Sequence, residues 1–158
     1  MRKLHYSIAL CFFISMGTAK GQTTDAGSLV PYFSAIIVSD MEASKSWYTE
    51  VLGFEVESEY QVSEGFSIIN LRRELAALEL IRLPTALSPK EAIPDYSGKT
   101  RLHGLFKIGF SVANLDTWVS HLSLHQVTFH GEVVTDPKGQ RMVVVLDPDG
   151  NRIQLFEK

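Results

Sequence analysis

The sequence predicts an α+β fold in which two βαβββ modules form a curled mixed sheet around a cleft. The first indication is an internal repeat: a capping site, an amphipathic helix and a β-rich run at residues 39–56 recur at 112–130. The second indication is that β-rich runs of strand length follow each predicted helix. Two such modules, set side by side, can curl their strands around one cleft. That cleft is therefore the first place to look for function.

Residues 1–21 are predicted to be a secretory signal peptide. Arg2 and Lys3 give a positive start, an apolar run follows, and the small residues Ala19 and Gly21 suit a cleavage site. The apolar run is shorter than the roughly 20 residues that a membrane-spanning helix needs. We therefore expect a secreted or periplasmic protein without a stable membrane anchor after cleavage.

The composition of the predicted mature chain argues against two classes of function. Removal of residues 1–21 leaves 12 basic residues against 18 acidic ones, a formal charge of −6, and no basic stripe. Nucleic acid is therefore not an expected partner. The single cysteine, Cys11, lies in the signal peptide, so we expect neither disulfides nor a thiol nucleophile. The polar residues 22–30 are predicted to be a flexible lead-in.

Residues 31–83 are predicted to be the first module of a single domain at 31–158. Its helix is expected to begin with a capping box, in which Ser39 and Glu42 satisfy free backbone N–H groups. Gly53 suits the position just after the helix. The predicted strands of this module are 32–38, 54–60, 66–71 and 77–83.

Residues 84–104 are predicted to link the modules, because they contain three prolines and two glycines. Loops of this length in compact domains often act as lids or binding loops. A plain connection between the modules is the alternative, and the sequence leaves both interpretations open.

Residues 105–158 repeat the order of elements as a second module. A helix capped by Asn114 follows the first strand, and a turn at residues 147–151 joins the last two strands. Alternation along the first strand sends Lys107, Gly109 and Ser111 toward the cleft. The same alternation places Phe106, Ile108, Phe110 and Val112 beneath the helix. The predicted strands are 105–112, 127–134, 141–146 and 153–156.

Two motifs carry a resemblance to a known family. The paired modules, with VSDMEASKSWYTEVLGFEV near the start and VVVLDPDGNRIQLFEK at the end, resemble the vicinal oxygen chelate superfamily. That group includes glyoxalase I, bleomycin-resistance proteins and type I extradiol dioxygenases. The resemblance covers about residues 32–158. It implies the fold, but the fold hosts metal enzymes and metal-free binding proteins alike.

The resemblance also implies where a metal would be held. In enzymes of that superfamily, His, Glu or Gln side chains from the first and last strands of each module bind a divalent metal in the cleft. The matching positions here carry Phe33, Glu79, Lys107 and Gln154. Phe33 has no lone pair, and a protonated lysine has only hydrogen-bond donors. One carboxylate and one amide fall short of the usual three ligands, so we expect no cofactor and no conventional metal centre.

Two functions from different classes follow from these four positions. In the first, the protein binds or sequesters a small organic molecule, with the Lys107 ammonium in place of the metal and Phe33 as an aromatic wall. An ion pair between Lys107 and Glu79 that merely satisfies two polar positions is the alternative reading of the pair. In the second, the protein is a divergent lyase, isomerase or dioxygenase whose metal is held by Glu79 and Gln154. A catalytic role for Lys107 as base or Schiff-base amine is disfavoured, because Glu79 would favour its charged form.

The sequence leaves the identity of the ligand open, and also whether the cleft closes within one chain or between two chains of a homodimer. Four other polar residues are predicted to be solvated. His121 and His125 have the spacing of a zinc pair but no third ligand, and Arg72 and Arg73 lie at the end of a strand, where they could also steer an anion.

Overall fold

The computed structural model describes residues 31–97, 100 and 102–158. The predicted signal peptide and lead-in lie outside the described residues. Two separate mixed sheets form, with strand orders β1-β4-β3-β2 and β5-β9-β8-β6, and β7 also pairs with β8. Parallel pairing joins β1 to β4 and β5 to β9, whereas the other pairs are antiparallel. The predicted α+β fold with a repeated order of elements is therefore confirmed.

The first sheet contains β1 (Ser34–Ile37), β2 (Glu55–Ser63), β3 (Phe66–Arg73) and β4 (Ala76–Arg82). The second contains β5 (Ile108–Val112), β6 (Thr128–Phe129), β7 (Val134–Thr135), β8 (Arg141–Leu146) and β9 (Arg152–Glu157). The helices are α1 (Met41–Ser46), which continues as the π-helical turn η1 (Trp47–Val51), α2 (Pro89–Ala92) and α3 (Leu115–Leu124). No helix in the described part of the chain is long and apolar enough to cross a membrane.

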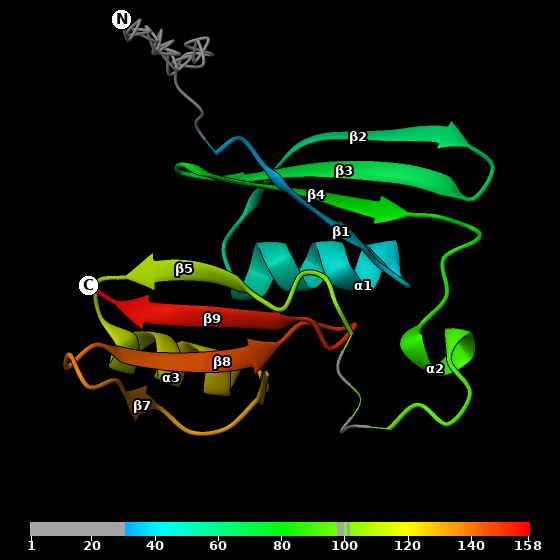
Figure 1. The fold of residues 1–158 in the computed structure, drawn as a ribbon. Helices are drawn as coiled ribbons and strands as arrows, with labels where there is room; N and C mark the ends of the chain where they lie inside the picture. Colours follow the sequence, from blue (N-terminus) through cyan, green and yellow to red (C-terminus); the bar gives the residue numbers. More distant parts are fainter. Residues whose placement is uncertain (1–30, 98–99, 101) are drawn as a thin grey trace, which may run out of the picture. The chain divides into compact units, whose positions relative to one another are not determined.

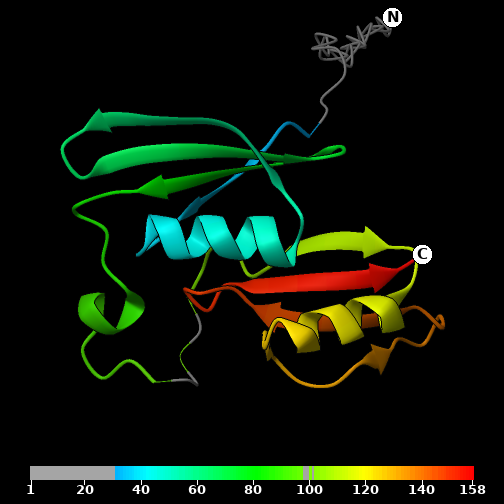
Figure 2. The ribbon, with the colours of Figure 1, turned by 180° about the vertical axis from the view of Figure 1, so that it is seen from behind.

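Each sheet has a long helical segment on one of its faces. The helix α1–η1 lies below the first sheet in both views, whereas α3 lies behind the strands of the second sheet in Figure 1 and in front of them in Figure 2. Strand residues that face these helices form the core, including Ile36, Leu80, Val145 and Leu155. We call the opposite side of each sheet its inner face, because the residues predicted to face the cleft lie there.

The helix α1 begins one residue later than predicted. Asp40, not Ser39, is the N-cap, and its Oδ1 accepts the backbone N–H of Ala43 at 3.0 Å. The Ser39 N–H instead donates to the carboxylate of Asp149 in the second module, at 3.1 Å. The predicted capping box is thus wrong, since a long-range partner takes the group that Glu42 was expected to satisfy. Asn114 caps α3 as predicted, accepting from the Thr117 N–H at 2.8 Å.

A buried hydrogen bond fastens the two modules together. The Tyr48 hydroxyl, from η1, donates to Asp147 Oδ2 in the turn between β8 and β9, at 2.9 Å. Both residues are buried, and Asn151 closes the same turn by donating two hydrogen bonds to the Asp147 carboxylate. Burial, followed by the negative charge of Asp147, raises the pKa of Tyr48. The hydroxyl therefore stays protonated and remains a donor.

Two strand predictions in the second module are wrong. The run at 127–134 is broken into β6 and β7, and Gly131 between them has a φ of +103°, outside the β region. The strand β5 begins at Ile108 rather than at residue 105. Phe106 therefore does not lie beneath α3. It is 59% exposed, and the Arg152 guanidinium lies 4.7 Å from the centre of its ring.

The linker contains one short helix. Ser88 caps α2 in a complete capping box with Glu91, and Pro89 occupies the first helical turn. The hydrogen bonds of this box lower the pKa of Glu91. None of the residues of α2 is buried, so the helix is held by its own local contacts rather than by the core.

Candidate functional site

Two of the four predicted site residues lie on the inner face of the first sheet or at its edge. Glu79 is in β4, where the backbone register places it opposite Ala35 of β1 and Asn70 of β3. Its neighbours Leu78 and Leu80 are buried on the other face, so strand alternation turns Glu79 away from the core. Phe33 comes one residue before β1 and is 53% exposed.

The other two lie in the second module. Gln154 is in β9, opposite Gly109 of β5 and Val144 of β8, and its buried neighbours in the strand face the core. Lys107 comes one residue before β5 and is exposed. The chain thus repeats one plan in both modules, with one site residue in the last strand and one just before the first strand.

Gln154 differs from the other three because its side chain is covered. It is 2% exposed, and its Nε2 lies 2.8 Å from the sulfur of Met142 on β8. The Phe156 ring leans across the adjacent strand, because a Cβ added at Gly109 would lie 3.1 Å from it. The Gln154 Oε1 has no hydrogen-bond partner among the described residues. Because this oxygen is buried, a ligand can reach it only if neighbouring side chains move.

The ion pair between Glu79 and Lys107, which the sequence left open as an alternative, is not formed. The ion pairs within the described ranges involve other residues: Lys45 with Glu42 and Glu59, Arg72 with Glu57, and Arg141 with Asp116 and Glu157. Lys107 therefore presents its ammonium to solvent, and Glu79 lies half-buried on its own sheet. The two residues are available to a ligand rather than committed to each other.

The donor set does not fit a divalent metal of the zinc or iron type. Glu79 supplies a carboxylate, but the only other oxygen, on Gln154, is buried beneath neighbouring side chains. Residues 31–97, 100 and 102–158 contain no group of three or more His, Cys, Asp or Glu side chains that could hold a metal ion. Sites of this type need about three firm ligands.

The histidine pair is only partly solvated. His125 is exposed, but His121 is half-buried and its Nε2 donates to the Val51 carbonyl at the end of η1, at 2.8 Å. The prediction of two solvated histidines is therefore wrong for His121, which joins α3 to the first module. The local helical spacing could not reveal this contact, because its partner lies 70 positions away in the sequence.

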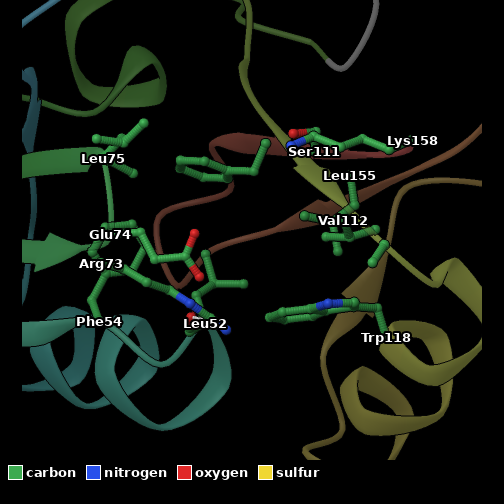
Figure 3. A pocket seen from close by; sticks show the side chains of 13 residues that line it. Leu52, Phe54, Arg73, Glu74, Leu75, Ser111, Val112, Trp118, Leu155 and Lys158 are labelled. Atoms are coloured by element: carbon green, nitrogen blue, oxygen red, sulfur yellow. Dashed lines mark hydrogen bonds between the residues drawn. The ribbon is translucent and has the colours of Figure 1, made fainter.

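One cavity lies between the modules, and none of the four predicted residues lines it. It has a volume of about 490 Å³, and we call it the junction cavity. Figure 3 shows Arg73 and Glu74 entering it from the β3–β4 turn, opposite Trp118 from α3. Its lining residues are Leu52, Phe54, Arg73, Glu74, Leu75, Ala76, Phe110, Ser111, Val112, Ala113, Trp118, Leu155 and Lys158.

A second cavity, of about 420 Å³, lies where α1 begins beside β2, β3 and β4. Its rim carries Glu42, Glu59 and Arg82, and Lys45 pairs with Glu59 nearby at 2.9 Å. Neither cavity contains Phe33, Glu79, Lys107 or Gln154.

Comparison with known proteins gives consistent matches. A family model described as the Glyoxalase/Bleomycin resistance protein/Dioxygenase superfamily matches residues 30–155. The uncharacterized protein YaeR of Escherichia coli (strain K12) is 30% identical over 131 residues, which cover 78% of this chain and 92% of YaeR. The uncharacterized protein YwkD of Bacillus subtilis (strain 168) is 32% identical over 128 residues, covering 78% and 93%. A solved glyoxalase family protein from Enterococcus faecalis superposes with a TM-score of 0.69 at 25% identity, covering 81% and 97%.

Proposed function

Because the chain belongs to the Glyoxalase/Bleomycin resistance protein/Dioxygenase superfamily, we propose that it binds a small organic molecule at the inner faces of its sheets without a conventional metal centre. The observation that carries this proposal is the donor set. Two of the four positions that hold the metal in enzymes of the family carry Phe33 and Lys107, neither of which can bind a cation.

The exposed groups at these positions suit an organic ligand better than a metal. Phe33 offers an apolar surface that is 53% exposed, and Lys107 offers a cation that no described carboxylate neutralises. Apolar walls with a few polar anchors are typical of small-molecule sites. The Lys107 ammonium would meet an anionic or carbonyl group, and Glu79 would accept a hydrogen bond.

A divergent enzyme of the lyase, isomerase or dioxygenase type is the second candidate. One observation favours it: the Gln154 Oε1 is buried without a described partner, and such an oxygen would be satisfied by a cation or by a ligand N–H. In that case Glu79 and Gln154 would hold the ion, and the ion would act as a Lewis acid. Movement of Met142 would be required first, since its sulfur covers the Gln154 amide.

The binding proposal is tested by an NMR screen of small organic fragments against the mature chain. Binding at the inner faces is expected to shift the amide signals of Ala35, Glu79 and Gly109, which lie in the strands that carry the site. Lys107→Met is expected to remove the binding of anionic fragments, whereas Lys138→Met, which changes an exposed lysine in a distant turn, is expected to leave it unchanged. If no fragment shifts these signals, or if Lys107→Met changes nothing, the proposal is wrong.

Export and dimer formation belong to the same proposal. The charged start, apolar run and small residues within 1–21 support cleavage of a signal peptide and release into the periplasm or the medium. The exposed apolar side chains of Phe33 and Ile37 at β1 support a second copy as a cover for the inner faces. Fractionation with N-terminal sequencing tests the first point, and light scattering of the mature protein tests the second.

A further inference from the structure

The junction cavity contains an arginine that the fold holds in one place. Arg73, at the end of β3, donates through Nη1 to the Leu52 carbonyl at the end of η1. Its guanidinium lies 5.1 Å from the centre of the Trp118 ring, in a cation–π contact between the modules. Gly53 leaves room for it, because a Cβ at that position would lie 2.9 Å from Nη1. Three elements therefore fix the guanidinium before any ligand arrives.

This fixed cation has no carboxylate partner among the described residues. Its neighbour Arg72 pairs with Glu57 at 2.9 Å, and Arg141 pairs with Asp116 and Glu157. Arg73 uses one of its five N–H donors on a carbonyl oxygen, which leaves its charge uncompensated. An arginine in this condition presents a planar fork of donors suited to a carboxylate.

Three aromatic side chains line the junction cavity. Trp118 lies under the guanidinium, and Phe54 and Phe110 pack edge-to-face with ring centroids 5.8 Å apart. Phe54 and Phe110 come from different modules, so the cavity exists only where the modules meet. Its volume of about 490 Å³ lies within the range that drug-sized ligands occupy, roughly 300–1,000 Å³.

Charged residues at the rim set the charge that a ligand should carry. Lys158 supplies a second cation, and Glu74 is the one carboxylate among the lining residues. In Figure 3 the Glu74 side chain extends beside Arg73 toward the centre of the cavity. Two cationic side chains against one carboxylate side chain favour a ligand with a negative charge.

We propose that the junction cavity is a second binding site, which takes a small organic monocarboxylate with an aromatic body. The carboxylate pairs with the free N–H donors of Arg73, and the aromatic ring packs against Trp118, Phe54 and Phe110. Glu74 weakens binding by like-charge repulsion and discriminates against more acidic ligands. This site is separate from Phe33, Glu79, Lys107 and Gln154, none of which lines the cavity.

The charge requirement is tested with two matched probes, indole-3-acetate and its neutral amide, indole-3-acetamide. Titration calorimetry and amide NMR shifts of the mature protein are expected to show binding of the acetate at the signals of Trp118 and Ser111. The amide is expected to bind at least about tenfold more weakly. Equal binding of both probes, or no binding of either at millimolar concentration, would overturn the proposal.

Variants at three consecutive residues, Arg72, Arg73 and Glu74, test the contribution of each charge to acetate binding. Arg73→Gln is expected to weaken acetate binding about tenfold or more, whereas Arg72→Gln, which breaks only a surface pair, is expected to leave it unchanged. Glu74→Gln is expected to tighten binding several-fold, a gain that no loss of folding can imitate. An equal loss in Arg72→Gln, or weaker binding in Glu74→Gln, would contradict the assignment. Lys107→Met is expected to leave acetate binding at the junction cavity unchanged. The proposals for this cavity and for the inner faces can therefore be refuted independently.

Discussion

Asp147 accepts four hydrogen bonds at the junction between the modules, whereas the Gln154 Oε1 on the inner face accepts none from the described residues. Both side chains are buried. The Asp147 network satisfies both the turn and Tyr48, so its polar groups serve stability. The Gln154 oxygen carries a desolvation cost that nothing in the described chain offsets. We infer that the Asp147 network holds the modules together, whereas the Gln154 oxygen is suited to a partner from outside the chain.

The largest expected effect comes from removing the junction carboxylate. Asp147→Ala is expected to lower the free energy of unfolding by about 3 kcal/mol, because it leaves the buried Tyr48 hydroxyl and several N–H groups unpaired. Urea denaturation measures this change. The matched control is Asp149→Ala, which removes an exposed carboxylate from the same turn and is expected to cost about 1 kcal/mol or less. Equal losses in the two variants would show that the buried network is not the main link between the modules.

Tyr48 gives a smaller effect with a characteristic pH dependence. Burial raises the pKa of Tyr48 in the folded state. As the pH rises above about 10, this tyrosine therefore loses its proton in the unfolded chain but keeps it in the folded chain. The stability from this group is thus complete below that pH and falls above it. Tyr48→Phe is expected to cost about 1 kcal/mol at neutral pH and to flatten the alkaline decline. Tyr60, which is exposed, serves as the control, since Tyr60→Phe is expected to change neither value. An alkaline decline of unchanged steepness in Tyr48→Phe would contradict this account.

A substitution at Gln154 on the inner face is expected not to lower the free energy of unfolding, unlike the two junction variants. Gln154→Leu removes the unpaired oxygen and keeps the volume, so the unfolding free energy is expected to stay the same or to rise by about 1 kcal/mol. Chemical denaturation of the ligand-free mature protein provides the measurement. A loss above about 1 kcal/mol would contradict the account, because it would mean that the amide stabilises the fold despite its unpaired oxygen.

The smallest effect concerns the rim of the junction cavity. Glu74 has a φ of +52°, in the left-handed region that costs a residue with a Cβ about 1 kcal/mol. Glu74→Gly is expected to raise the melting temperature slightly, with a gain of about 0.5 kcal/mol. The neighbouring Leu75→Gly is the control and is expected to give no gain, because Leu75 is not among the residues with positive φ. A destabilised Glu74→Gly would mean that the side chain contributes to folding rather than to binding.

The sequence predicts the modules well because their signals are local. The repeated helices, the Asn114 cap and the alternation along β5 each depend on residues within a few positions. The links between modules depend on distant residues, and those predictions failed. The Ser39 N–H is taken by Asp149 and the His121 ring by the Val51 carbonyl, so a capping box and a solvated pair were expected instead.

For the candidate sites too, local sequence positions could be predicted and contacts between distant residues could not. The resemblance alone makes Phe33, Glu79, Lys107 and Gln154 candidates, because it gives their positions in the sequence. The sequence does not reveal that Met142 covers Gln154, or that Arg73 stacks on Trp118, since both contacts arise only when the chain is folded. Neither Gly53 nor Arg73 carries a local sequence signal for a cavity, because the two residues lie far apart in the sequence.

The metal content of the mature protein tests the central claim most directly. The protein is incubated with Zn²⁺, Ni²⁺, Fe²⁺ or Mn²⁺, desalted and analysed by mass spectrometry of the bound elements, with Glu79→Gln as the matched variant. Because Phe33 and Lys107 supply no ligands, we predict far less than one ion per chain and no difference between the two proteins. One firmly bound ion per chain that is lost in Glu79→Gln would contradict the account and establish the metalloenzyme alternative.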